Sequence, residues 1–221
     1  MKLITICGYS LTGKTTVAET LIRALKAQGY SVGSVKDIHF EDFALDVSGS
    51  NTDKHRQAGS ELVTARGKNE TDILYPKQLS MQKILAFYTQ DFVVVEGYRE
   101  LHAAKILTAE KREDLAELLD DNVIAISGKI AQEITEYQGI PVINCLENAD
   151  ALLALVLEKT YSYLPNAQLI SKQAVSLKID GKDIDISLLM QQKIKHAVTA
   201  ILQELNIDQS GEALTLSLKK E

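Results

Sequence analysis

Residues 8–15 read Gly8-Tyr9-Ser10-Leu11-Thr12-Gly13-Lys14-Thr15, and this stretch decides the fold. It fits the pattern G-x-x-x-x-G-K-[ST], in which a glycine-rich loop surrounds a phosphate group. The run Leu3 to Cys7 before it is short and apolar, which predicts a strand covered on both faces. After the loop, apolar residues recur at helical spacing from Val17 to Leu25. A strand before the loop and a helix after it are the context that a phosphate-binding loop requires.

Each part of this loop has an expected role. The glycines let backbone amides turn inward, where the amides and the helix N-terminus surround phosphate oxygens. Lys14 is expected to bridge the β- and γ-phosphates, and the Thr15 hydroxyl to ligate Mg²⁺. We therefore predict a nucleotide site formed by Gly8, Ser10, Leu11, Thr12, Gly13, Lys14, Thr15 and Thr16, with Thr16 at the α-phosphate.

A second element is the strand-like run Val93-Val94-Val95-Glu96-Gly97. It is apolar and ends in a carboxylate followed by a glycine. A hard cation favours oxygen ligands, so an acid at this place is expected near Mg²⁺, usually through water. We predict Thr15 and Glu96 as the metal residues, Lys14 and Glu96 as the catalytic candidates, and Gly97 beside the γ-phosphate.

The rest of the chain alternates predicted strands and helices. Strands are expected at 31–36, 61–65, 71–74, 91–97, 123–127 and 141–144, and helices at 80–88, 149–159 and between the last two strands. This rhythm predicts an α/β domain over residues 1–162, a mostly parallel sheet with helices on both faces. Pro165-Asn166 marks a linker. A hairpin around Asp180-Gly181, a helix at 187–205 and a strand at 213–218 predict a small C-terminal ββαβ module over 163–221.

The segment after residue 36 is rich in charged and histidine side chains: Lys36-Asp37-Ile38-His39, then Asp46, then Gly49 to Gly59. Two interpretations stay open. One is a switch or substrate loop with Asp46 or Asp53 near the metal and Arg56 at a phosphate. The other is a solvated loop with surface charges.

The composition restricts the class of protein. The 221 residues are 45% hydrophobic and 24% charged, as in an ordinary globular protein. The net charge of −6 argues against general affinity for nucleic acid or anionic membranes. No bilayer-length apolar run or signal-peptide pattern is evident, so we expect a cytoplasmic protein. Cys7 and Cys145 lie in apolar runs and are expected to be buried free thiols.

These elements together resemble the molybdopterin-guanine dinucleotide biosynthesis protein B (MobB) family over about residues 1–160. The Gly-turn with His-Arg-x-Ala-Gly and the strand end Val-Glu-Gly-Tyr are more specific than the loop alone. The stretches that carry the resemblance are Gly8 to Thr16, Ser34-Val35-Lys36, Gly49 to Gly59, Val93 to Arg99, Lys105-Ile106, Val123 to Ile126 and Ile140 to Val142.

The resemblance implies a GTP-binding protein with Mg²⁺ and weak GTP hydrolysis, usually a homodimer. It implies a part in molybdenum cofactor maturation: assisting the nucleotidyltransferase MobA as it attaches GMP to molybdopterin, itself a candidate ligand. By position, Lys14 and Thr15 hold the nucleoside triphosphate and Mg²⁺, Glu96 lies beside the metal, and Arg56 faces the cofactor or nucleotide. Family members often carry an Asp for the guanine edge where this chain reads Ser127-Gly128-Lys129, although Lys129 offers a stacking partner for a purine.

Other functions are weighed against this one. A metal-insertion GTPase of the nickel or cobalt chaperone kind shares the sheet and loop, but generally carries a His-rich tract or a Cys metal motif. A small-molecule kinase needs an arginine-bearing lid, for which Lys111-Arg112 is a weak candidate. A binding module without catalysis is the remaining alternative, so enzymatic activity beyond a weak GTPase is not assigned.

Overall fold

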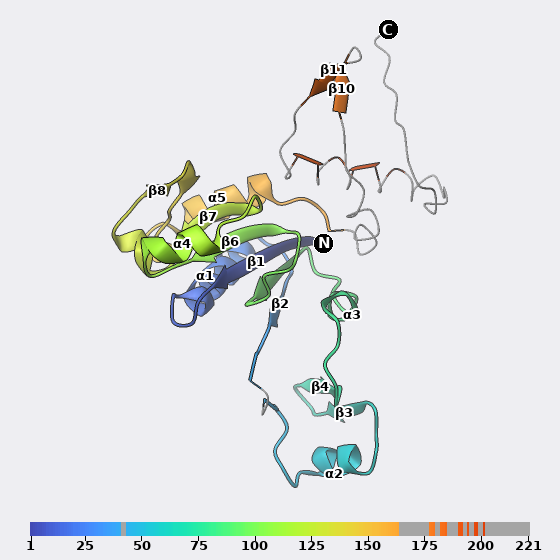
Figure 1. Ribbon diagram of the computed structural model, residues 1–221. Coiled ribbons are helices and arrows are strands. Elements are labelled where there is room, and N and C mark those ends of the chain that lie inside the picture. Colours follow the sequence, from blue (N-terminus) through green and yellow to red (C-terminus); the bar gives the residue numbers. More distant parts are fainter. Residues whose placement is uncertain are drawn as a thin grey trace. The chain divides into compact units, whose positions relative to one another are not determined.

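The computed structural model describes residues 1–40, 43–163, 177–179 and 182–184, and positions 190, 191, 194, 197, 198 and 201 (Figure 1). The chain divides into two compact units. One contains Met1–Asp37 and the described residues from Thr89 onward, and the other is Ile38–Tyr88. The sequence did not predict this division, because residues 38–88 were placed inside one continuous domain.

A five-stranded parallel sheet forms the centre of the first unit, in the order β2-β5-β1-β6-β7. The strands are β1 (Lys2–Gly8), β2 (Val32–Lys36), β5 (Phe92–Glu96), β6 (Ala104–Thr108) and β7 (Val123–Ser127). The strands β5, β6 and β7 are buried along their whole length, as expected for parallel strands covered on both faces. The predicted parallel α/β sheet is confirmed.

Helices cover both faces of this sheet. On one face, α1 (Lys14–Ala27) and α5 (Ala149–Lys159) pack through Leu21 and Val156 into a core that includes Ile4 and Ile6 of β1. On the other face, α4 (Arg112–Leu118) and the short 3₁₀ helix η1 (Lys129–Gln132) pack in a second core that contains Cys7. Both cysteines are buried free thiols, as predicted.

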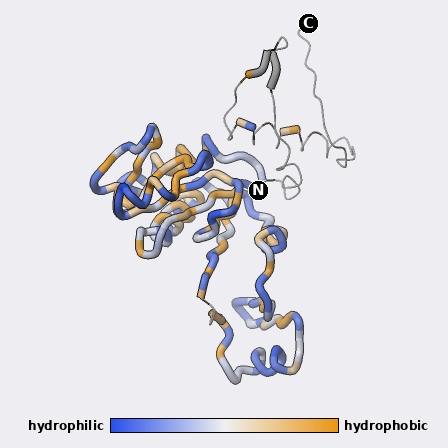
Figure 2. Tube along the Cα trace, in the orientation of Figure 1, coloured by the Kyte–Doolittle hydropathy of each residue, from blue (hydrophilic) through white to orange (hydrophobic). Residues whose placement is uncertain are grey.

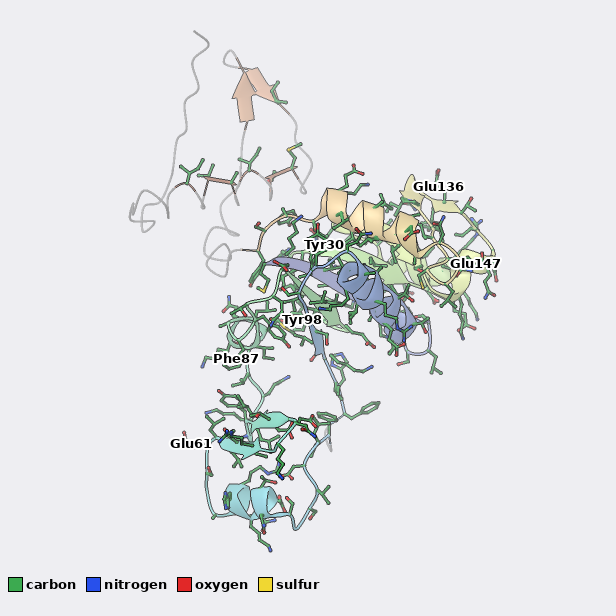
Figure 3. All side chains as sticks on the ribbon, turned by 180° about the vertical axis from the view of Figure 1, so that it is seen from behind. Tyr30, Glu61, Phe87, Tyr98, Glu136 and Glu147 are labelled. Carbon is green, nitrogen blue, oxygen red and sulfur yellow. The ribbon has the colours of Figure 1, made fainter. Side chains whose placement is uncertain are left out.

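Edge-on aromatic packing connects the end of α1 to the sheet. Tyr30 follows the helix stop at Gly29, where φ is 88°. Its ring packs edge-on against Phe92 of β5, with 4.9 Å between the ring centroids (Tyr30 is labelled in Figure 3). Such contacts add to area burial, so this pair holds the connection from α1 into β2 against the sheet.

Two elements of this unit were missed and one was wrong. The sequence predicted neither β6, which lies between β1 and β7, nor α4. The strand predicted at 141–144 is wrong: β8 (Glu136–Tyr137) and β9 (Ile140–Pro141) form a short antiparallel hairpin. Only Val142 then bridges to Ile126 of β7. The helix expected between these strands is one turn of 3₁₀ helix.

The second unit, Ile38–Tyr88, is small. It contains α2 (Asn51–Gln57), an antiparallel pair formed by β3 (Val63–Arg66) and β4 (Thr71–Leu74), and α3 (Met81–Leu85). Helix α2 is mainly hydrophilic (Figure 2). β3, β4 and α3 agree with the predicted types, although α3 is shorter than the predicted 80–88 helix.

In the C-terminal region, β10 (Leu177–Ile179) and β11 (Lys182–Ile184) pair antiparallel, as the predicted hairpin requires. The described positions from 190 to 201 are helical and fall within the helix predicted at 187–205. The linker at Pro165-Asn166 and the strand at 213–218 lie outside the described residues, and the boundary at 162/163 stays a prediction. No described helix has the length and apolar character needed to cross a membrane.

Candidate nucleotide-binding site

The loop between β1 and α1 has the backbone that its sequence requires. Gly13 precedes the helix with φ at 105°. A Cβ at Gly8 would lie 2.1 Å from the Thr108 carbonyl oxygen, so only glycine fits beside β6. Leu11 is exposed and has φ at 64°, a left-handed conformation that non-glycine residues rarely adopt. Strain of this kind is typical of ligand-binding loops.

The N-terminus of α1 is left open for an anion. No side chain caps it at Gly13, and its first turn holds no acidic residue. The first amides of a helix lack partners within the helix and carry a partial positive charge. In this 14-residue helix the amides that follow Gly13 can therefore bind phosphate oxygens.

Thr12 connects the loop to the neighbouring strand. Its side chain is buried, and its hydroxyl lies 2.8 Å from the Tyr9 carbonyl oxygen and 2.7 Å from the Thr108 hydroxyl. The Thr108 hydroxyl lies 3.1 Å from the Cys7 carbonyl oxygen, so the two hydroxyl protons serve two of these three contacts at a time. These contacts fix the loop to β1 and β6, and a role for Thr12 at the phosphates stays a prediction.

Lys14 is folded over the loop. Its Nζ donates to the carbonyl oxygens of Gly8 at 3.0 Å and Tyr9 at 2.6 Å. Burial lowers the pKa of Lys14 below its ordinary value, and the nearby Glu96 carboxylate opposes part of that shift. Neutral carbonyl oxygens are weaker partners for an ammonium than a phosphate is, so Lys14 is available to a nucleotide.

Thr15, Glu96 and Lys36 meet at the C-terminal ends of β5 and β2. The Thr15 hydroxyl donates to Glu96 Oε1 at 2.8 Å. Lys36 Nζ lies 2.9 Å from the same oxygen and 3.3 Å from Thr15 Oγ1. Glu96 is 8% exposed, so this is a nearly buried carboxylate with two donors on one oxygen.

These groups fit a magnesium ion. A hydroxyl and a carboxylate oxygen, next to a loop that can hold phosphates, are the hard oxygen donors that Mg²⁺ prefers. The structure brings together Thr15 and Glu96, the two predicted metal residues. The sequence reasoning missed Lys36 as a member of the site. The signal that could have indicated Lys36 is its position at the end of a predicted strand, as Glu96 is at the end of another. In the structure these two strands, β2 and β5, pair in parallel.

Gly97 continues from Glu96 with φ at 95°. Its amide donates to the Ile6 carbonyl oxygen at 2.9 Å, and an added Cβ would lie 3.0 Å from the Asp37 carbonyl oxygen. The next residue, Tyr98 (labelled in Figure 3), accepts a weak hydrogen bond from the Cys7 thiol through its carbonyl oxygen. Gly97 therefore allows three backbone segments to approach one another beside the loop.

The stretch Ser127-Gly128-Lys129 borders the loop on its other side. The Ser127 hydroxyl is used internally, since it donates to the Ile143 carbonyl oxygen at 2.6 Å. The Lys129 amide donates to the Thr12 carbonyl oxygen at 3.3 Å. The Lys129 ammonium forms an ion pair with Glu110 at 3.1 Å, with both side chains half-exposed. Glu110 is a carboxylate that the sequence reasoning did not single out, and stacking of Lys129 on a purine stays a prediction.

Arg56 belongs to the second unit, where its guanidinium donates to Asp53 at 2.7 Å and lies 3.8 Å from Asp46. Asp53 also accepts from the Gly49 amide, and Asp46 from the hydroxyls of Ser50 and Thr52. The hydrogen bond and charge of Asp53 raise the pKa of Arg56. Neither carboxylate is solvated freely, so both form a network around the start of α2. A role for Arg56 at the nucleotide or cofactor stays a prediction.

Residues 3–129 match the family described as molybdopterin guanine dinucleotide synthesis protein B. The chain belongs to this family. A probable molybdopterin-guanine dinucleotide biosynthesis adapter protein of Bacillus subtilis is 25% identical over 144 residues, 63% of this chain and 83% of that protein. The Haemophilus influenzae adapter protein is 31% identical over 139 residues, 60% of this chain and 77% of that one. The resemblance seen in the sequence is therefore confirmed.

A longer relative covers the C-terminal region as well. A putative adapter protein of Methanocaldococcus jannaschii is 23% identical over 224 residues, 93% of this chain and 92% of that protein. This match includes most of residues 163–221. The region is therefore shared with another protein of the same description.

Solved structures support the fold. The crystal structure of Bacillus subtilis MobB matches with a TM-score of 0.62 and 22% identity, over 74% of this chain and 100% of that one. The crystal structure of a MobB homologue from Bacillus stearothermophilus matches with a TM-score of 0.54 and 23% identity, over 71% of this chain and 96% of that one.

Proposed function

We propose that this chain is an adapter protein of molybdopterin-guanine dinucleotide biosynthesis and that it acts with Mg²⁺-GTP bound at the loop between β1 and α1. Membership of the family and the adapter proteins among its relatives support the adapter role. The observation that carries nucleotide binding is the open N-terminus of α1 beside the Thr15–Glu96 pair.

The residues divide the work by charge. Lys14 moves from the carbonyl oxygens of Gly8 and Tyr9 to the β- and γ-phosphates, a stronger partner for its ammonium. Amides of the loop and of the first turn of α1 hold the remaining phosphate oxygens. Thr15 ligates Mg²⁺, and Glu96 holds the metal's water or the metal itself.

Hydrolysis is proposed to be weak. In the loaded site Glu96 holds the metal or its water, so this carboxylate is not free to orient an attacking water. Bound GTP is then needed as a ligand of the adapter, or as the source of GMP, more than for its hydrolysis. We propose that the protein works in the cytoplasm as a homodimer, with a MobA-type nucleotidyltransferase and molybdopterin as partners.

Equilibrium binding tests this proposal directly. The purified protein should bind a fluorescent GTP analogue in the presence of Mg²⁺, and Lys14→Ala should abolish that binding. Lys26→Ala is the matched control, because Lys26 is exposed at the other end of the same helix. Absence of nucleotide binding, or retained binding in Lys14→Ala, would refute it.

Two further measurements test the guanine preference and the adapter role separately. Equal affinity for ATP and GTP would contradict a guanine preference while leaving phosphate binding intact. In a reconstituted reaction with nucleotidyltransferase, molybdopterin and Mg²⁺-GTP, the chain should raise the rate of GMP attachment. An unchanged rate would contradict the adapter role.

A further inference from the structure

We propose that Lys36 is a resident cation of the metal site: in the nucleotide-free protein its ammonium takes the place of Mg²⁺, and the metal enters only by displacing it. This inference rests on the proposed function, since it concerns how that same site is loaded. It assigns to Lys36 a positioning role, exerted through Glu96 and Thr15.

The geometry places the ammonium on both predicted metal ligands. Lys36 Nζ lies 2.9 Å from Glu96 Oε1 and 3.3 Å from Thr15 Oγ1, and these two oxygens are themselves only 2.8 Å apart. A single cation thus touches a carboxylate and a hydroxyl that come from different elements of the fold. These are the same atoms that would contact Mg²⁺ or its water.

The sheet register creates this arrangement. β2 and β5 are parallel, and Lys36 stands opposite Glu96 in the last pair of their ladder. Thr15 lies in the first turn of α1, which follows the central strand next to β5. Lys14 makes its hydrogen bonds elsewhere, because its Nζ donates to the carbonyl oxygens of Gly8 and Tyr9.

The two side chains differ in exposure, and this difference makes the pair exchangeable. The Glu96 side chain is 11% exposed, whereas that of Lys36 is 55% exposed. A nearly buried carboxylate is costly without a cation beside it. A half-exposed lysine on an edge strand can instead move into water with little loss. The site therefore requires a cation, but it does not require this one.

Charge balance then links metal entry to the nucleotide. With Mg²⁺ alone, the metal would join Lys14 and Lys36 beside the Glu96 carboxylate. A triphosphate brings several negative charges, so the displaced ammonium and the metal are both compensated once it binds. Lys36 therefore weakens Mg²⁺ binding in the nucleotide-free protein.

The test uses nucleotide-free protein and Mg²⁺ alone. Thermal unfolding is followed in millimolar MgCl₂ and in NaCl of equal ionic strength, for the unchanged protein, Lys36→Met, Lys36→Arg and the control Lys26→Met. We expect a larger magnesium-specific rise in Tm for Lys36→Met than for the other three proteins. A Mg²⁺ titration should show binding about three- to fivefold tighter in that variant, the factor expected for releasing a partly exposed ion pair. Lys36→Arg keeps the charge and should behave as the unchanged protein does.

A second measurement does not depend on the stability of that variant. Acetylation of each lysine is quantified by mass spectrometry in the unchanged protein and in Glu96→Gln, which keeps the shape of the side chain. Lys36 should react more slowly than Lys26 in the unchanged protein and faster in Glu96→Gln. Equal Lys36 rates in the two proteins, or no magnesium-specific gain in a folded Lys36→Met, would overturn the inference.

The outcome is independent of nucleotide binding. If the protein binds no GTP analogue, the proposed function fails, while the metal and acetylation results still decide the role of Lys36. If GTP binds but Lys36→Met gains nothing from Mg²⁺, only the inference about Lys36 fails.

Discussion

Replacing Gly128 by alanine tests how the candidate site is held together. Gly128 has φ at 85° and ψ at −156°, a region that is essentially restricted to glycine. An added Cβ would lie 2.3 Å from the Thr12 carbonyl oxygen. Real Cβ atoms essentially never approach closer than 3.0 Å, so the loop or the Gly128 segment has to move by more than half an ångström.

The loop has little freedom to make that movement. Thr12 is held by its hydroxyl to Tyr9 and Thr108, and its carbonyl oxygen accepts from the Lys129 amide. Backbone strain of about 1–3 kcal/mol and overpacking of about 1–3 kcal/mol then give a loss of roughly 2–6 kcal/mol in the free energy of unfolding. Because the moved segment carries the phosphate site, binding of a fluorescent GTP analogue should weaken by at least about tenfold, the equivalent of 1.4 kcal/mol.

Gly29 provides the matched control. Its φ is 88°, but an added Cβ there would meet no atom within 4 Å. Gly29→Ala should therefore cost only the left-handed strain, about 1–2 kcal/mol, and leave nucleotide binding unchanged. Both variants are compared by urea denaturation followed by circular dichroism. If Gly128→Ala costs no more than Gly29→Ala and binds nucleotide normally, the tight contact between the two loops is not what positions the site.

Two other predictions concern charged groups away from the phosphate loop. The Lys105 ammonium is buried in β6 and paired with Asp120, which is partly exposed. Asp120→Ala leaves this buried charge without its carboxylate and should lower the free energy of unfolding, measured by urea denaturation, by about 3 kcal/mol or more. Lys105→Met removes the charge itself and should cost clearly less. An equal loss in the two variants would argue against this asymmetry. Hydrogen bonds from Ser50 to Asp46 and from Arg56 to Asp53 hold the pKa of each carboxyl below its ordinary value of about 3.9. Their contribution to stability is thus complete above that value and is lost as the pH falls through it toward the lowered native pKa. NMR signals of α2 should show melting of this helix as the pH falls below about 4, and already at higher pH in Asp53→Asn; a helix that keeps its signals in acid would contradict the network.

Much of the fold follows from patterns that are contiguous in the sequence. The phosphate loop needs two glycines at fixed spacing, and the apolar runs of β1, β5 and β7 are long enough to be recognised as buried parallel strands. Helix α5 was predicted with the bounds that the structure shows, 149–159. In each of these elements, local preference and burial favour the same structure.

Strand β6 shows where such patterns fail. It reads Ala104-Lys105-Ile106-Leu107-Thr108 and is buried at every position, yet it begins with alanine and carries a lysine. The lysine inside this buried strand is neutralised by Asp120, fifteen residues away after α4, and its ammonium also donates to the Arg99 carbonyl oxygen. The prediction of a strand at 141–144 is wrong because the pairing of this run is set by residues outside it. Pro141 of that run pairs with Glu136 in a hairpin, and the run meets the sheet only at Val142, which bridges to Ile126, and at Ile143, whose amide donates to the Ile126 carbonyl oxygen.

The sequence by itself determined that a phosphate-binding loop stands at the end of a buried strand, and that a carboxylate, Glu96, ends another. It also determined the family, through short motifs whose residues lie next to one another. Only the tertiary structure decided that Lys36, sixty residues before Glu96, donates to the same Glu96 oxygen as Thr15 does. The strand register sets that contact, because adjacent parallel strands place residues distant in sequence side by side, and no local pattern records which pair will meet.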